Sequence, residues 1–246
     1  KTLVKTRKFY YNVKEVGDNM KYLFVVAHPD DEVLGAGGLI YNLIKSGKEV
    51  KICFMCSGAE ARKTISDKIS VREQAINSLK ILGISESNII FGTFPNIKMN
   101  TIPHIDIVKF IESAFIDFKP NVVITHYTDD LNSDHKITSE CCDEAIRYFQ
   151  RNNMVTRIDK YMYMEVLSST DWIIGKQFTP NYFYEIGNVG LEKKIEALKE
   201  YDSALRQFPH PRSEQNIRAL ATIRGCQSSQ NYSEGFLIAF EFAKEN

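Results

Sequence analysis

Short apolar runs alternate with amphipathic segments along most of this chain. Four runs are too short for helices and are typical of strands buried on both faces of a sheet, at residues 22–27, 49–56, 88–91 and 121–125. The segments between the runs carry apolar residues at helical spacing, at residues 33–46, 68–82 and 105–118. Gly47 and Gly83 end the first two of these helices. The pattern therefore predicts alternating strands and helices.

The remaining third of the chain continues this pattern less regularly. A helix is expected just after residue 135, followed by strands at 161–167, 182–186 and 235–242 and helices at 191–205 and 216–224. The alternation predicts an α/β fold, Rossmann-like, with a mostly parallel sheet and helices on both faces in three layers. We interpret residues 1–246 as a single domain, in which the polar, basic residues 1–21 form an N-terminal arm.

Reactive side chains follow the first buried strand. His28-Pro29-Asp30-Asp31-Glu32 come directly after residue 27, and the carboxyl end of a parallel strand is where α/β sheets bind ligands. Adjacent acids at a buried position are costly unless a cation compensates them. His28 and Asp31 offer a nitrogen and an oxygen donor, both suited to zinc. The alternative is an acidic loop that only caps the next helix.

The fourth strand also ends in ligand-type residues. Residues 126–135 read H-Y-T-D-D-L-N-S-D-H, and strand ends of a parallel sheet gather on one edge. His135 could therefore supply a third ligand from a distant part of the chain. A histidine at the start of a helix is more often structural, but the second acidic loop on the same edge favours the ligand interpretation.

Composition excludes several classes of protein. Lys+Arg and Asp+Glu are equal at 31 each, so no excess charge indicates a nucleic-acid partner. No apolar run is long enough for an integral membrane segment, and the N-terminus lacks the apolar core of a signal peptide. The five cysteines have no framework spacing, and Cys53 and Cys56 should point to opposite faces of a buried strand. These features predict reduced thiols and a cytoplasmic location.

Several of these motifs together resemble the PIG-L/LmbE family of zinc-dependent N-deacetylases. The resemblance rests on A-H-P-D-D-E at 27–32 followed by Asp134-His135. Weaker agreement comes from Gly37-Gly38, Arg72-Glu73, Arg224-Gly225 and Y-S-E-G-F at 232–236.

The resemblance implies a role for each matching residue. His28, Asp31 and His135 match the ligands of Zn²⁺ or another divalent metal, and Asp30 matches a general base that takes a proton from metal-bound water. The substrate would be an N-acylated, most often N-acetylated, amino sugar or its conjugate. Three further residues are expected near the site: Glu32 and Asp134 to orient ligands, and Arg72 to face the substrate.

One position departs from the family pattern. Many members carry a histidine three residues before the last ligand, where it stabilises the oxyanion, and this chain has Asn132. An asparagine can donate a hydrogen bond to that charge but cannot deliver a proton. Protonation of the leaving amine then falls to Asp30, or to His126 or Tyr127, which are expected on the substrate side of the same loop. We favour Asp30.

Two alternatives to an enzyme remain open at this point. The glycines of G-A-G-G at 35–38 could cradle a phosphate in a nucleotide-binding protein, although the spacing is not G-x-G-x-x-G and the acids upstream would repel phosphate. The loss of the usual histidine also leaves room for a protein that holds a metal without turnover. The sequence leaves the exact substrate and the oligomeric state open.

Overall fold

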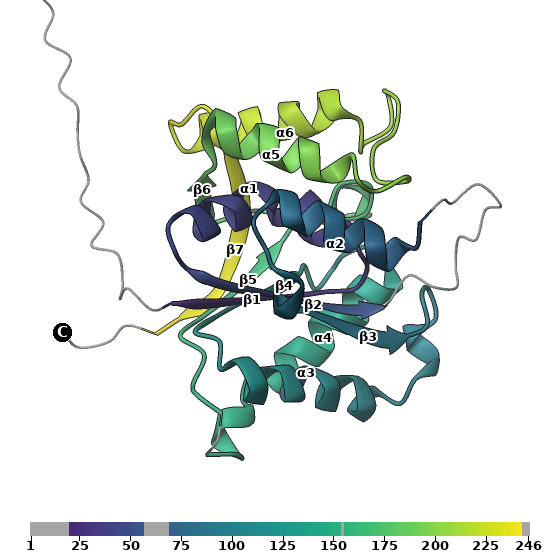
Figure 1. Ribbon diagram of the computed structural model, residues 1–246, viewed down its shortest axis with the longest axis vertical. Coiled ribbons are helices and arrows are strands. Elements are labelled where there is room, and N and C mark those ends of the chain that lie inside the picture. The colour runs from purple at the N-terminus through teal and green to yellow at the C-terminus, as the bar shows by residue number, and fades with distance from the viewer. Residues whose placement is uncertain (1–19, 57–68, 154, 243–246) are drawn as a thin grey trace, which may run out of the picture.

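The computed structural model describes residues 20–56, 69–153 and 155–242. Within them, seven strands form one sheet in the order β3-β2-β1-β4-β5-β7-β6 (Figure 1). The strands are β1 Lys21–Val26, β2 Glu49–Cys56, β3 Ile89–Phe94, β4 Val122–His126, β5 Lys160–Met164, β6 Tyr182–Glu185 and β7 Ser233–Glu241. The first five pair in parallel, whereas β7 runs antiparallel to both β5 and β6. The expected mostly parallel sheet is confirmed.

Helices cover both faces of this sheet. One face carries α1 Asp31–Lys45, α2 Val71–Ile81, α5 Gly187–Leu198 and α6 Glu214–Gln227, and the other carries α3 His104–Phe118 and α4 Ser133–Ala145 (Figure 1). Short 3₁₀ turns lie at η1 Glu86–Asn88, η2 Met99–Thr101, η3 Tyr148–Gln150 and η4 Thr170–Trp172. The three-layer α/β architecture predicted from the apolar pattern is therefore the observed one.

The central strand shows why the apolar runs are continuous rather than alternating. Phe24 and Val26 pack into the apolar cluster beneath α1, α2 and α5, whereas Leu23 and Val25 pack into the cluster beneath α3 and α4. All four side chains have 0 % exposure. A strand with helices on both faces needs apolar residues at every position.

The order of the sheet places the functional loops next to each other. The chain steps outward from β1 to β2 and β3, and then returns to lay β4 on the other side of β1. The two connections leave β1 and β4 in opposite directions, so a crevice opens between their carboxyl ends. Ligands in open α/β sheets bind at this switch point.

The glycines after β1 serve packing rather than phosphate binding. They lie inside α1, where a Cβ on Gly35 would collide with Met164 and one on Gly38 would lie 2.6 Å from Ile186. The α1 backbone departs from helical geometry at Ala36, and the buried Glu234 carboxylate accepts hydrogen bonds from Gly38 N and Leu39 N just beyond. An anionic side chain already takes these donors, which contradicts the nucleotide-binding alternative.

Lys194 balances the charge of that carboxylate. Its Nζ lies 2.7 Å from Glu234 Oε1, and both side chains are buried. The pair joins α5 and β7 to the middle of α1, so the C-terminal part of the chain stabilises the helix that begins at the site.

Some sequence expectations need correction. The expected helix at 191–205 is shorter and begins earlier, and the strand expected at 161–167 ends at Met164. Cys53 and Cys56 pack into the same cluster, because a register shift between Phe54 and Cys56 turns the second thiol to the side of the first. The arm at 1–21 lies outside the described residues except for its last two, and Lys21 already belongs to β1.

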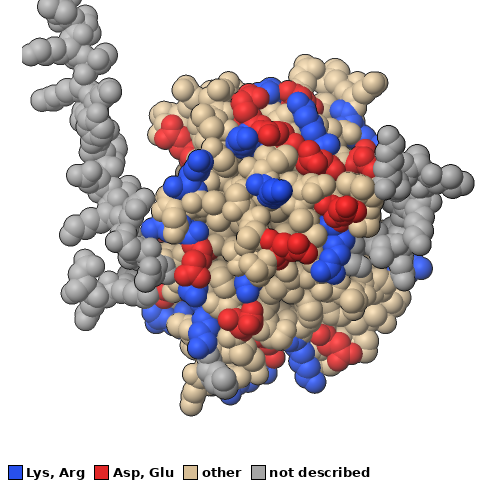
Figure 2. Space-filling model, viewed as in Figure 1, with Lys and Arg blue, Asp and Glu red and all other residues tan. Residues whose placement is uncertain are grey.

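Surface properties fit the balanced composition. Figure 2 shows acidic and basic side chains interspersed on one face of the molecule, without a patch of a single sign. All five cysteines are free, and four of them are buried. Across the described residues, no helix combines the length and the apolar character needed to span a bilayer. The cytoplasmic location stays a prediction.

Candidate metal centre

The end of β1 turns sharply into α1 and brings three polar side chains to the crevice. His28 N donates to Asp31 Oδ2 at 2.8 Å, which closes the turn and fixes the Asp31 carboxylate at the first residue of α1. Between them, Asp30 has a φ of 110°, a conformation that is rare for residues other than glycine. Such strain persists only where surrounding contacts hold it, and it is frequent at functional sites.

The end of β4 supplies the opposite wall. Asn132 caps α4, because its Oδ1 accepts a hydrogen bond from Asp134 N at 2.9 Å. This cap starts α4 at Ser133 and places His135 in the first turn, where its side chain is 3 % exposed. The capping residue of α4 is therefore Asn132.

The two loops meet at one carboxylate oxygen. Asp31 Oδ2 lies 3.3 Å from His28 Nδ1 and 3.2 Å from His135 Nε2. The ligand atoms of these three residues all lie within 4.8 Å of one another. Two imidazole nitrogens and one carboxylate oxygen form a donor set that fits a catalytic zinc site, which keeps a position open for water.

Each of these imidazoles has a second carboxylate behind it. His28 Nε2 lies 3.0 Å from Asp134 Oδ2, and His135 Nδ1 lies 3.2 Å from Asp130 Oδ1. In metal sites such carboxylates fix the tautomer and the orientation of the ring. His28 Nδ1 and His135 Nε2 are thus the nitrogens left for a metal, and Asp134 orients the distant His28 rather than its neighbour His135.

The carboxylates are themselves held in place. Asp134 accepts hydrogen bonds from Ile97 N and Met99 N at 2.6 and 3.2 Å. Asp130 Oδ2 accepts from the Ser169 and Thr170 hydroxyls, in the loop after β5. Each imidazole is therefore braced through a carboxylate by a segment remote from both ligand loops.

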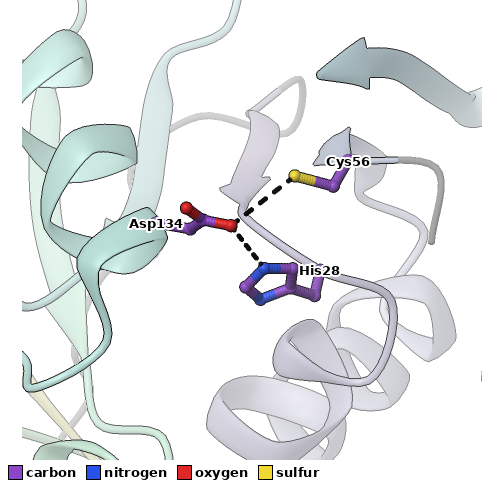
Figure 3. Close-up of side chains that lie close together, drawn as sticks. All are labelled: His28, Cys56 and Asp134. Carbon is purple, nitrogen blue, oxygen red and sulfur yellow. Dashed lines mark hydrogen bonds and ion pairs between the residues drawn. The ribbon is translucent and has the colours of Figure 1, made fainter. Parts of the chain in front are cut away.

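A second group of donors shares His28. Figure 3 shows the Asp134 carboxylate between the His28 ring and the Cys56 thiol, with Cys56 Sγ 4.0 Å from Asp134 Oδ2. A neutral imidazole has one lone pair, so a metal here would compete with the Asp31 side for the same ring. Burial also raises the pKa of the Cys56 thiol, and metals bind thiolates. The Asp31 side is the better metal site.

The charges of the metal-free chain fit this picture. Burial by itself would lower the pKa of His135, but the Asp31 and Asp130 carboxylates outweigh it and raise that pKa to about 9. In the same way, Asp134 and Asp31 raise the pKa of His28 well above its usual value against the effect of burial. Protonated imidazoles thus compensate the buried acids, and a metal cation would replace those protons.

A cavity of about 270 Å³ opens directly in front of these residues. Its polar side chains are His28, Asp30, Asp31, Asn132, His135, Ser168, Ser169, Ser203, Asn96 and Arg212. Asp30 does not belong to the ligand group. Its Oδ2 instead accepts a hydrogen bond from Arg212 Nη1 at 3.1 Å. The adjacent carboxylates Asp30 and Asp31 therefore face different partners in the same cavity.

Three other predicted site residues lie elsewhere. Arg72 is exposed and its guanidinium lies 4.3 Å from the centre of the Phe91 ring, outside the cavity lining. Tyr127 packs edge-on against Phe178, also outside the lining. His126 has 0 % exposure, because it stacks behind His135 with ring centres 3.9 Å apart and accepts a hydrogen bond from Ala27 N. These positions do not suit direct substrate contact.

Glu32 supports Asp30 rather than a metal ligand. Its Oε2 accepts a hydrogen bond from Asp30 N at 3.1 Å, and its Oε1 accepts one from the Tyr201 hydroxyl at 2.6 Å. The orienting role expected for Glu32 therefore applies to the residue matched to the general base.

Sequence reasoning missed Asp130, Ser169, Tyr201 and Arg212. Asp130 was in the quoted loop, yet nothing marked it out from Asp129, which is half exposed and pairs with Lys176. Arg212 lies in a Pro-Arg-Ser segment before α6, and Tyr201 lies after α5. The helices expected at 191–205 and 216–224 did not single out either residue, because a helical pattern does not indicate the direction of a side chain at its end or just before it.

Comparisons with known proteins indicate the family of this chain. Residues 23–146 match the PIG-L family model, described as GlcNAc-PI de-N-acetylase. Diacetylchitobiose deacetylase from Thermococcus kodakarensis is 25 % identical over 237 residues, which cover 89 % of this chain and 82 % of that protein.

Solved structures share the fold. N,N'-diacetylchitobiose deacetylase from Pyrococcus horikoshii, in complex with an inhibitor, superposes with a TM-score of 0.73 at 21 % identity, covering 90 % of this chain and 84 % of that one. The hydratase GalB from Pseudomonas putida KT2440 reaches 0.73 at 19 % identity, covering 92 % and 99 %. Identities this low show the fold alone, so the reaction type is decided by the family match. The resemblance seen in the sequence is confirmed: this chain belongs to the PIG-L family, the de-N-acetylases, and is an enzyme of that type.

Proposed function

We propose that this chain is a zinc-dependent hydrolase that removes an N-acetyl group from an amino sugar or an amino-sugar conjugate. One observation carries the proposal. His28, Asp31 and His135 converge as a metal-type donor set, while Asp30 faces the same cavity without joining that set. A separate carboxylate beside a metal site is what base-assisted hydrolysis needs.

The residues of this chain have distinct roles in the proposed reaction. A zinc ion bound by His28, Asp31 and His135 would supply a Lewis acid that polarises the amide carbonyl and acidifies water. Asp30 accepts the proton of the attacking water and then delivers it to the nitrogen as the C–N bond breaks. The products are acetate and the free amine, and one residue serves as base and then as acid.

Asn132 takes the position of the histidine found in many family members. Its Oδ1 is held by Asp134 N–H, which fixes the orientation of the amide and leaves the Nδ2 donors for the cavity that Asn132 lines. An amide N–H can stabilise the developing oxyanion by a hydrogen bond. It cannot deliver a proton, which is why we assign protonation of the amine to Asp30.

Two observations support the amino-sugar substrate. The deacetylases from Thermococcus kodakarensis and Pyrococcus horikoshii are named for an acetylated amino sugar. The cavity of about 270 Å³ is also near the lower end of the range of small-molecule sites. This size suits one acetylated sugar unit at the reaction centre, with any conjugated group outside.

The test measures bound metal and product release on the same preparations. The wild-type chain should bind one zinc by elemental analysis and release amine and acetate from N,N'-diacetylchitobiose or N-acetylglucosamine, free or nucleotide-linked. Asp30→Asn should retain the zinc and lose about 10²–10⁴-fold in kcat, the usual contribution of a general base. Asp129→Asn is the matched control, because Asp129 is on the other ligand loop and pairs with Lys176 at the surface.

Three results would contradict the proposal. Zinc without amine release would favour the metal-holding alternative. A chain that binds no zinc would refute the proposed ligand set. Equal rates for Asp30→Asn and Asp129→Asn would remove Asp30 from the mechanism.

A further inference from the structure

Arg212 is the cationic partner of Asp30, from a part of the chain 182 residues away. The ion pair joins Arg212 Nη1 to Asp30 Oδ2 at 3.1 Å, and each side chain is 12 % exposed. Both side chains line the cavity that contains the metal-type donors. A carboxylate on a short side chain has few orientations, and a single buried guanidinium contact is enough to select one of them.

The loop that carries Arg212 is fixed on both sides. Arg212 N donates to His210 Nδ1 at 3.0 Å, and Arg212 O accepts from Arg206 N at 3.1 Å. The next residue, Ser213, caps α6 by accepting from Asn216 N. The backbone is therefore anchored to the start of a helix, which places the guanidinium reproducibly.

The contacts of Arg212 indicate a role beyond packing. Its Nε is buried and has no hydrogen-bond partner among the described residues. An unsatisfied buried donor costs free energy, and one on a charged group costs more. Arg224 offers a contrast at the same burial, because its Nε and Nη2 both donate to Glu165 at 2.7 Å. Arg224 satisfies its pair fully, whereas Arg212 gives up a donor to reach Asp30.

Asp30 is the residue at this site whose conformation needs support. Its backbone has a φ of 110°, and its N–H is held by Glu32, which is held in turn by Tyr201. Tyr201 and Arg212 both lie in the connection between α5 and α6. This connection therefore supports the backbone of Asp30 through Glu32 and contacts its carboxylate directly.

We propose that Arg212 is a positioning residue, which fixes the Asp30 carboxylate toward the reaction centre. This inference rests on the proposed function, in which Asp30 is the general base. It requires that Arg212 affect turnover only through Asp30 and leave the metal site and the affinity for substrate largely unchanged. Misplacing a catalytic group by about 1 Å can cost on the order of 10²-fold in rate.

The experiment compares Arg212→Ala, Arg212→Lys and Asp30→Ala, the double variant Asp30→Ala with Arg212→Ala, and Arg224→Ala. We expect Arg212→Ala to keep its zinc and to lose about 10²-fold in kcat, with KM within about 3-fold of the wild type. Millimolar guanidinium should restore part of that rate in Arg212→Ala, because the small cation can occupy the vacated position. The double variant should be no slower than Asp30→Ala, since residues that act as a unit are not additive.

Arg224→Ala controls for the loss of an equally buried ion pair. It should lower the melting temperature while leaving kcat per folded molecule unchanged. If Arg212→Ala does not fold, Arg212→Lys keeps the charge and the stem but loses the planar fork, and we expect it to lose about 10-fold in kcat.

Several outcomes would overturn the inference. They are a kcat for Arg212→Ala near that of the wild type, a rise in KM alone, loss of zinc, or a further loss in the double variant equal to that of the single one. A wild-type chain that binds zinc but releases no amine overturns the proposed function as well, so the two failures are distinguishable.

Discussion

Two sides of this cavity, the metal side with the proposed ligands His28, Asp31 and His135 and the base side with the proposed base Asp30, are held by different parts of the chain. His28, Asp31 and His135 come from the ends of β1 and β4, which are neighbours in the sheet. The carboxylates that contact the two imidazoles, Asp134 and Asp130, both lie after β4. Asp30 is adjacent to a proposed ligand in sequence, yet its carboxylate is held by Arg212, and Glu32, which accepts from its backbone N–H, is held by Tyr201. Arg212 and Tyr201 both lie in the connection between α5 and α6.

The family match follows the same division. It covers residues 23–146, which contain every proposed ligand, and ends before Tyr201 and Arg212. A metal site needs only its donors and the sheet that brings them together, so its residues are set by a short motif on each loop. The direction of a base is set by tertiary contacts, which vary with the layer packed over the site. The two sides should therefore respond differently to substitution.

Removing a metal ligand should have the largest effect. His135→Ala leaves two donors, which is too few for a catalytic zinc site, so we expect loss of bound zinc and a fall in activity on the order of 10³-fold or more. Elemental analysis and an amine-release assay on one preparation measure both. His104→Ala is the control, because His104 pairs with Glu144 at the exposed start of α3. Retention of zinc by His135→Ala would contradict the assignment of His135 as a metal ligand.

Acidification should weaken metal binding steeply. The raised pKa values of His28 and of His135, the latter about 9, mean that both rings carry protons at neutral pH in the metal-free chain. Binding must release the proton of His135 and, wherever the pH lies below its raised pKa, that of His28, so the zinc Kd should rise at least about 10-fold for each unit of pH lost between pH 8 and pH 6. Titration with a competing chelator across that range measures the slope. A flat response above pH 7 would show that the rings have ordinary pKa values.

The sequence was sufficient for most of the fold and for the convergence of His28, Asp31 and His135. Uninterrupted apolar runs at 22–27 and 121–125 identified the two buried strands, and polar residues after each run identified the loops. The sequence did not predict the side-chain environment of two expected site residues, Arg72 and His126. Arg72 was expected at the site because it matched a family position, but its guanidinium stacks on Phe91 instead. His126 looked available in the sequence and is covered by His135 in the fold.

The base side could not be predicted, for a physical reason. Periodicity reports which face of an element is buried, but a half-buried arginine in a loop has no period. Tyr201 and Arg212 act through one hydrogen bond each to residues about 170–180 positions away. Contacts of this kind depend on how α5 and α6 pack over α1, which no local pattern records.

Neutralising the carboxylate behind His28 should have an intermediate effect. Asp134→Asn keeps the shape of the side chain but removes the charge that holds the ring, so we expect a 10–100-fold loss of zinc affinity or activity. The asparagine amide keeps one acceptor oxygen, so it can retain only one of the two hydrogen bonds that Asp134 accepts from Ile97 N and Met99 N. Asp143→Asn is a control, because Asp143 accepts from Tyr161 and Tyr163 away from the ligands. Equal zinc affinity in both variants would contradict the orienting role.

A smaller effect is expected on the base side from Tyr201→Phe. The change removes the hydroxyl that donates to Glu32 and leaves a buried carboxylate oxygen without that donor, at a cost of about 1–3 kcal/mol in the free energy of unfolding. Because Glu32 holds Asp30 N, kcat should fall several-fold while bound zinc stays at the wild-type level. Denaturant unfolding and the zinc assay together separate the two quantities. Loss of zinc in this variant would show that the contacts of Tyr201 also stabilise the metal site, so that the two sides are not independent.

Cys56→Ser should have the smallest effect, and it decides where the metal binds. Cys56 belongs to the second donor group, with His28 and Asp134, and a serine hydroxyl is a poor replacement for a thiolate ligand. If zinc binds on the Asp31 side, its affinity and kcat should each stay within about 2-fold of the wild type, because the thiol is buried, its pKa is raised, and it has no role there. A fall in zinc affinity of 100-fold or more would move the metal to the far side of the His28 ring, away from His135. The proposed division of labour between Asp30 and Asp31 would then lose its geometric basis.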